Sequence, residues 1–231
     1  MAVIHHTTMT PTKLELLTAW LPTRPWYVGA AGEPELAKAG GFRLDDPEGE
    51  VGIEVMVVTD TSGERPVSYL VPLSYRSAPL DGAEQAVVGT SEHGVLGKRW
   101  IHDGTHDPVV VGQLLALAQG RAEAQAQSVS DAPDPSVTGR FTGAGVSTEV
   151  ASLAVTDGVD GTDVVVETVA DEDPASELTL RVTVTRVLPS PQRQTPPVDP
   201  TSPRGEITAG WQLPDGSEHR APFVLIGDAE H

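Results

Sequence analysis

The spacing of apolar residues predicts one helix and a strand hairpin in the first third of the chain. Three leucines recur at helical intervals and predict a helix that starts at Pro11, with Thr10 as its cap, and ends at Pro22. Apolar and polar residues alternate over 66–75, as expected for a strand with two different faces. A second strand is expected over 51–59, with a turn at 62–64 joining the two. The leucines are Leu14, Leu17 and Leu21.

A third strand and a second helix are predicted further on. The strand is expected over 94–102, and the helix over 108–124, where apolar residues again recur at helical intervals. Asp107 stands at the position of a helix cap, and aspartate is a preferred capping residue. This half of the chain therefore combines helices with strands.

The second half reads as strands throughout. Residues 178–185 alternate strictly between apolar and polar side chains, which favours an antiparallel strand with one face on the core. The remaining strands are expected at 149–155, 163–169, 207–213 and 223–226. Two arrangements remain open, because these strands can extend the sheet of the first half or form a separate barrel or sandwich.

A polar segment predicts where the chain divides. Residues 126–138 are rich in serine, aspartate and proline, so we place a linker at 128–139 between domains at 1–127 and 140–231. Residues 189–204 contain so many prolines that they cannot build a sheet, since proline lacks the N–H group. We expect an exposed proline-rich loop there.

Composition excludes several classes of function. The 231 residues carry a formal net charge of -18 and no cysteine, so disulfides and thiolate chemistry are excluded. Binding to nucleic acid or anionic lipid is disfavoured, because both need basic residues. No targeting segment or apolar run long enough to span a membrane is visible, so we expect a cytoplasmic protein without membrane contact.

Four motifs follow one another in the first half of the chain: PWYVG, GGFRL, VPLSYRSAPL and GTSEHGVLGKRWIHDGTHDPVVVGQLLALAQG. Their order resembles the N-terminal cap domain of bacterial maltokinases, enzymes of trehalose and glycogen pathways that make maltose 1-phosphate, and the resemblance covers roughly residues 1–127. It implies a cystatin-like curved antiparallel sheet with helices. We therefore expect an α+β fold, followed by an antiparallel β-rich C-terminal module.

Kinase activity is not expected, because a kinase of that superfamily needs a strand lysine and a catalytic-loop asparagine. The chain has no asparagine, and its only lysines are Lys13, Lys38 and Lys98. The resemblance thus implies a stand-alone cap-like protein that lacks the kinase catalytic domain.

The densest group of potential ligands comprises His102, Asp103, His106 and Asp107. Two histidines four residues apart could bind a metal on one helix, but Gly104 interrupts this stretch. The pattern favours a turn in which the two aspartates accept backbone N–H bonds, so no metal or cofactor is expected. A sugar or partner contact at this cluster is the alternative.

Aromatic and basic residues form a second candidate group for ligand or partner contacts. Sugars stack on rings and accept hydrogen bonds from arginine, yet scarce rings more commonly fill a core. We expect two of the rings, in the loop of Trp26 and Tyr27, to be exposed. The group consists of Trp26, Tyr27, Arg43, Tyr75, Arg76 and Trp100.

These observations favour a non-catalytic binding or accessory protein linked by resemblance to maltose, trehalose and α-glucan metabolism. It would contact an enzyme of that metabolism or a carbohydrate, and homo-oligomerisation is left open. The alternative is a small sugar-binding module or carbohydrate-active enzyme with a site around His102–Asp107.

Overall fold

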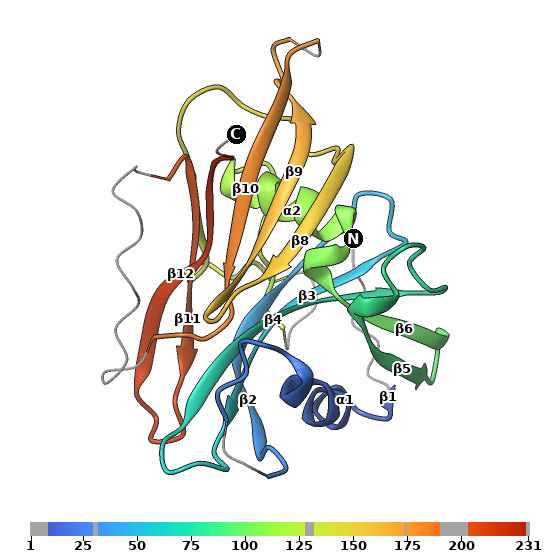
Figure 1. Ribbon diagram of the computed structural model, residues 1–231, viewed down its shortest axis with the longest axis vertical. Helices are drawn as coiled ribbons and strands as arrows, with labels where there is room; N and C mark the ends of the chain where they lie inside the picture. Colours follow the sequence, from blue (N-terminus) through green and yellow to red (C-terminus); the bar gives the residue numbers. More distant parts are fainter. Residues whose placement is uncertain (1–8, 30–31, 128–131, 174, 190–202, 230–231) are drawn as a thin grey trace.

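The computed structural model describes residues 9–29, 32–127, 132–173, 175–189 and 203–229. Within these ranges two α-helices, α1 (Lys13–Trp20) and α2 (Pro108–Ala118), accompany twelve strands (Figure 1). Short 3-10 turns lie at Leu21–Thr23, Glu84–Ala86 and Gly104–His106. The strands are β1 (Met9–Thr10), β2 (Leu36–Leu44), β3 (Gly52–Asp60), β4 (Val67–Arg76), β5 (Val87–His93), β6 (Gly97–Asp103), β7 (Thr138–Phe141), β8 (Ser152–Asp157), β9 (Gly161–Val169), β10 (Glu177–Thr185), β11 (Gly205–Gln212) and β12 (Glu218–Asp228).

All the described strands join one antiparallel sheet in the order β1-β5-β6-β4-β3-β2-β11-β12-β10-β9-β8, with β7 on β11. Of the two arrangements left open, the strands of the second half therefore extend the sheet of the first half. The α+β class is confirmed in outline, and the cystatin-like detail stays a prediction. The division into domains with a linker at 128–139 also stays a prediction.

The strand β3 is buried on both faces, because a helix covers each. Val55 and Val57 belong to a core cluster with α2, whereas Met56 and Val58 belong to a cluster with α1. Alternate residues of a strand point to opposite faces, so one continuous apolar run serves both cores.

The helix α2 lies inside the bend of the sheet, against strands from both halves (Figure 1). Its Leu114 and Leu115 share one core cluster with Ile53 of β3, Val182 of β10 and Phe223 of β12. The largest core therefore requires both halves of the chain. Asp107 caps the start of this helix, because its side chain accepts from Val109 N. Gly120 follows the end of the helix with a φ of 69°, which is unfavourable for other residues.

The structure corrects three predicted boundaries. The cap of α1 is Thr12 rather than Thr10, since Thr12 and Glu15 form a reciprocal capping box. The helix α2 ends at Ala118 instead of residue 124 because of Gly120. The strand predicted from residue 94 begins at Gly97, after a turn in which the His93 ring accepts two backbone N–H bonds.

Four of the described strands were not predicted from the sequence: β1, β2, β5 and β7. The strand β2 contains Gly40 and Gly41, which weaken the apolar alternation, and it carries a bulge after Lys38. The proline-rich loop falls mainly on 190–202, outside the described residues.

Candidate ligand-binding site

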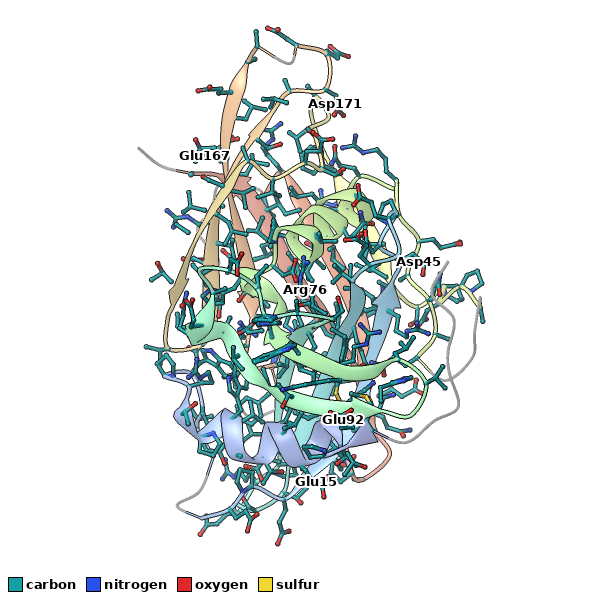
Figure 2. The ribbon with its side chains drawn as sticks, turned by 90° about the vertical axis from the view of Figure 1, so that its right-hand side faces the viewer. Glu15, Asp45, Arg76, Glu92, Glu167 and Asp171 are labelled. Atoms are coloured by element: carbon teal, nitrogen blue, oxygen red, sulfur yellow. The ribbon has the colours of Figure 1, made fainter. Side chains whose placement is uncertain are left out.

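A cavity of about 750 Å³ lies on the α1 side of the sheet. Its walls come from the first turn of α1, the segment 49–54 that enters β3, and the β5–β6 hairpin. Figure 2 faces this side of the molecule, with Glu15 labelled on α1 and Glu92 on β5. Cavities of this size commonly hold small organic ligands.

Neighbouring strands place the polar side chains of the cavity. Arg43 of β2 is the direct partner of Glu54 of β3, so the two side chains share a face of the sheet. Tyr75 comes from the end of β4, and Arg99 from the face of β6 opposite to Lys98 and Trp100. The cavity is lined by Arg43, Glu54, Tyr75 and Arg99, whereas Lys98 and Trp100 lie outside it.

Glu54 holds the floor of the cavity together. Its side chain is 6% exposed, forms an ion pair with Lys13, and accepts from Tyr75 Oη at 2.9 Å. The second carboxylate oxygen accepts from Gln127 Nε2 at 3.1 Å. The Lys13 ammonium also lies 5.3 Å from the centre of the Tyr75 ring. Glu54 is therefore a positioning residue whose oxygens are engaged within the protein.

Electrostatics perturb two more groups of the cavity. Burial, followed by the charge and hydrogen bond of Glu54, raises the pKa of Tyr75 well above its usual value of 10.0. Desolvation lowers the pKa of Lys38, with Glu54 opposing and Lys13 assisting this effect. Perturbed groups in a concave site are typical of functional sites. Tyr75 thus remains a neutral donor at physiological pH.

The predicted cluster at 102–107 forms turns and caps. Asp103 accepts from Thr105 N, and Asp107 accepts from Val109 N, as the turn interpretation predicts. Asp107 also binds both Arg76 Nε and Nη2, at 2.6 and 2.7 Å. Within the described ranges, no group of three or more histidine or acidic residues could hold a metal ion.

The two histidines of this cluster are apart from the cavity. His102 is fully buried, and its Nε2 accepts from Leu80 N at 3.2 Å. His106 is half-buried, and desolvation lowers the pKa of both imidazoles. Neither residue lines the cavity.

Most of the aromatic and basic candidate residues also lie outside the cavity. The expectation that Trp26 is exposed is wrong: it is fully buried, packed edge-on against Trp20 and beside Tyr69. Tyr27 is half-buried, stacks on Tyr69, and donates to Asp60. Trp100 lies under Lys98 on the other side of the hairpin. Of the ten candidate residues, the cavity brings together Arg43 and Tyr75 alone.

Sequence reasoning missed Lys13, Lys38, Glu54, Arg99 and Gln127 as a group. One signal was available, because Glu54 is a charged residue inside the apolar run 51–58. Two of the chain's three lysines also line the cavity. Their proximity depends on pairing between β2, β3 and the hairpin, which no local pattern shows.

The described residues define an α+β protein with a single open antiparallel sheet and a cavity rich in basic side chains. Residues 20–107 match the family model of the maltokinase N-terminal cap domain, which confirms the resemblance. The match points to a carbohydrate-metabolism context, and it includes Arg43, Glu54, Tyr75 and Arg99. No helix in the described part of the chain is long and apolar enough to cross a membrane.

Proposed function

We propose that this protein is a non-catalytic, cytoplasmic accessory protein of maltose, trehalose or α-glucan metabolism, and that it binds a carbohydrate in the cavity beside α1. The observation that carries the proposal is the cavity itself, about 750 Å³ in volume, within a stretch largely matched by the maltokinase cap model. Its volume accommodates a mono- or disaccharide.

The lining has the mixture that sugars need. Tyr75, Met56 and Leu14 offer a ring and apolar surface, and arginines and lysines offer hydrogen-bond donors around them. Glu54 keeps Lys13 and Tyr75 in place because it bridges α1, β4 and Gln127. A preorganised site of this kind loses little entropy when a ligand binds.

The non-catalytic part of the proposal rests on how the acidic groups are used. Glu54 is engaged by Lys13, Tyr75 and Gln127, and Asp103 and Asp107 are bound by arginines and backbone amides. These contacts favour structural roles over proton transfer. The alternative, a sugar-binding or enzymatic site around His102–Asp107, has the weaker support, since those side chains serve as turn and cap groups.

Isothermal titration calorimetry with maltose, maltotriose and trehalose tests the proposal. Leu96 is 46% exposed and lines the cavity, whereas its neighbour Val95 is 63% exposed and does not. We expect Leu96→Trp to obstruct the cavity and weaken binding about tenfold or more, and Val95→Trp, the matched control, to bind like the unaltered protein.

Absence of saccharide binding by the unaltered protein would contradict the proposal. An equal loss of saccharide affinity in Leu96→Trp and Val95→Trp would show that the saccharide binds outside this cavity. Recovery of an enzyme of α-glucan metabolism together with the tagged protein, without saccharide binding, would favour a role through a protein partner.

A further inference from the structure

The charge of the cavity contrasts with the charge of the chain. The protein has 33 acidic and 15 basic residues, yet four basic side chains line this one cavity. They are Lys13, Lys38, Arg43 and Arg99. Basic residues concentrated in a concave site attract anions even when the net charge of the protein is negative.

Three of these cations have no ion-pair partner in the part of the chain that the structure describes. Lys13 is paired with Glu54, whereas Lys38, Arg43 and Arg99 have no carboxylate partner at ion-pair distance among the described residues. Arg43 Nη1 and Arg99 Nε are shielded from solvent and have no hydrogen-bond partner there either. Shielded donors without partners cost free energy, and a ligand that accepts from them recovers it.

The acidic residues of the cavity cancel this charge only in part. Glu54 is already paired, and Asp46 directs both carboxylate oxygens to the backbone N–H groups of Glu48, Glu50 and Val51. Asp46 and Glu50 also raise the pKa of Arg76, after its main partner Asp107, so part of their field falls on that arginine. Glu50 is exposed, and with Asp46 and Glu54 it makes three carboxylates against four basic side chains, so the lining keeps an excess of one positive charge.

We infer that the ligand of this cavity is an acidic carbohydrate, whose phosphate or carboxylate group binds between Lys38, Arg43 and Arg99. This inference rests on the proposed carbohydrate site and adds the chemical class of its ligand. Guanidinium groups bind phosphate and carboxylate oxygens through paired N–H donors, and charge-assisted bonds of this kind are the stronger ones. The sugar ring then lies against Tyr75 and the apolar wall.

The test compares four probes by titration calorimetry at low and high salt: glucose, glucose 1-phosphate, glucuronic acid and inorganic phosphate. We expect at least one acidic sugar to bind about tenfold or more tightly than glucose, since a hydrogen bond to a charged group contributes roughly 1.5–3 kcal/mol. High salt should reduce this preference. The stronger of the two acidic sugars identifies whether phosphate or carboxylate is recognised.

Variants of the two cavity arginines test where the phosphate or carboxylate of the ligand binds. Arg99→Gln and Arg43→Gln should each reduce the affinity for the acidic sugar about tenfold, a clearly larger loss than either variant causes for glucose. Lys98→Gln is the control, because Lys98 neighbours Arg99 in sequence and lies over Trp100 outside the cavity. It should bind like the unaltered protein.

The outcomes separate the two proposals. Equal affinity for glucose and both acidic sugars overturns this inference and leaves the carbohydrate site intact. Binding of inorganic phosphate as tight as that of the sugar phosphate also overturns it, because the sugar then contributes nothing. Binding of none of the sugars overturns the proposed function together with the inference.

Discussion

His102 shows how burial of a single residue determines its chemistry. The side chain has no exposure, its Nε2 accepts from Leu80 N, and its Nδ1 has no partner among the described residues. Desolvation therefore lowers the pKa of the imidazole below 6.5, with Asp107 opposing and Arg76 assisting. The neutral imidazole is therefore the favoured form at this buried position.

The lowered pKa of His102 predicts that the free energy of unfolding falls with acidification. The unfolded chain takes up a proton as the pH falls through about 6.5, whereas the folded protein resists it, so the stabilisation present above that pH is lost below it. Chemical denaturation at pH 7.5, 6.0 and 5.0 measures this slope.

His102→Gln removes the titrating group, so the free energy of unfolding should fall less steeply between pH 6.5 and 5 than in the unaltered protein. The lowered pKa of His106 acts in the same direction and leaves part of the slope in place. An unchanged slope in the variant would contradict the assigned role of His102.

At the scale of elements, α2 approaches the segments around it closely enough to require glycine. A methyl group on Gly112 would overlap the carbonyl oxygen of Thr148, and one on Gly139 of the neighbouring β7 would overlap the carbonyl oxygen of Leu117. The helix can therefore lie tightly inside the bend of the sheet. Neither glycine needs a left-handed backbone, so the constraint is contact with other segments.

This contact predicts that Gly112→Ala destabilises the protein although alanine is the better helix former. Helix propensity favours alanine by about 1 kcal/mol, whereas overpacking a close contact costs about 1–3 kcal/mol and displaces backbone here. We expect a net loss in the free energy of unfolding, measured by urea denaturation.

Gly227→Ala is the control for that experiment, because nothing lies within 4 Å of the added methyl group in β12. It should be neutral within about 0.5 kcal/mol. Stabilisation by Gly112→Ala would show that the segment around Thr148 moves away freely.

At the scale of the whole molecule, Arg186 joins the two halves of the chain. It is fully buried just after β10, and its Nη2 lies 2.6 Å from Asp103 Oδ2 at the end of β6. Its Nε donates to Thr162, and its guanidinium lies 4.9 Å from the centre of the Trp26 ring. Burial acts to raise the pKa of Asp103, but Arg186 and Thr105 outweigh it and keep the pKa lowered.

We expect removal of the Arg186 cation to lower the free energy of unfolding by a large amount. Arg186→Met leaves the Asp103 carboxylate buried without its partner, and breaking a buried ion pair in this way costs about 3–5 kcal/mol. The double variant Arg186→Met with Asp103→Asn should recover part of the loss, because no buried charge remains. Urea denaturation, monitored through the tryptophans, measures both.

The shared sheet and core also predict that the protein unfolds in one transition. Separate transitions for the two halves would contradict this expectation. A loss below about 1 kcal/mol in Arg186→Met would show that Asp103 finds other partners or takes up a proton at little cost.

Local chemistry allowed part of the fold to be predicted from the sequence. The alternation in β4 and β10, the apolar spacing in α2, and the capping role of Asp107 depend on near neighbours in the chain, so pattern alone indicates them. The maltokinase-cap resemblance was available for the same reason, since contiguous residues carry it.

The sequence by itself determined the element types of the longer segments, the turn at 102–107, and the acidity of the chain. Only the tertiary structure decided that the C-terminal strands continue the first sheet, that Trp26 is buried, and that Lys13, Lys38, Arg43 and Arg99 meet around one cavity. The physical reason is that strand pairing and helix packing join residues far apart in the chain, and propensity and periodicity report only what near neighbours do.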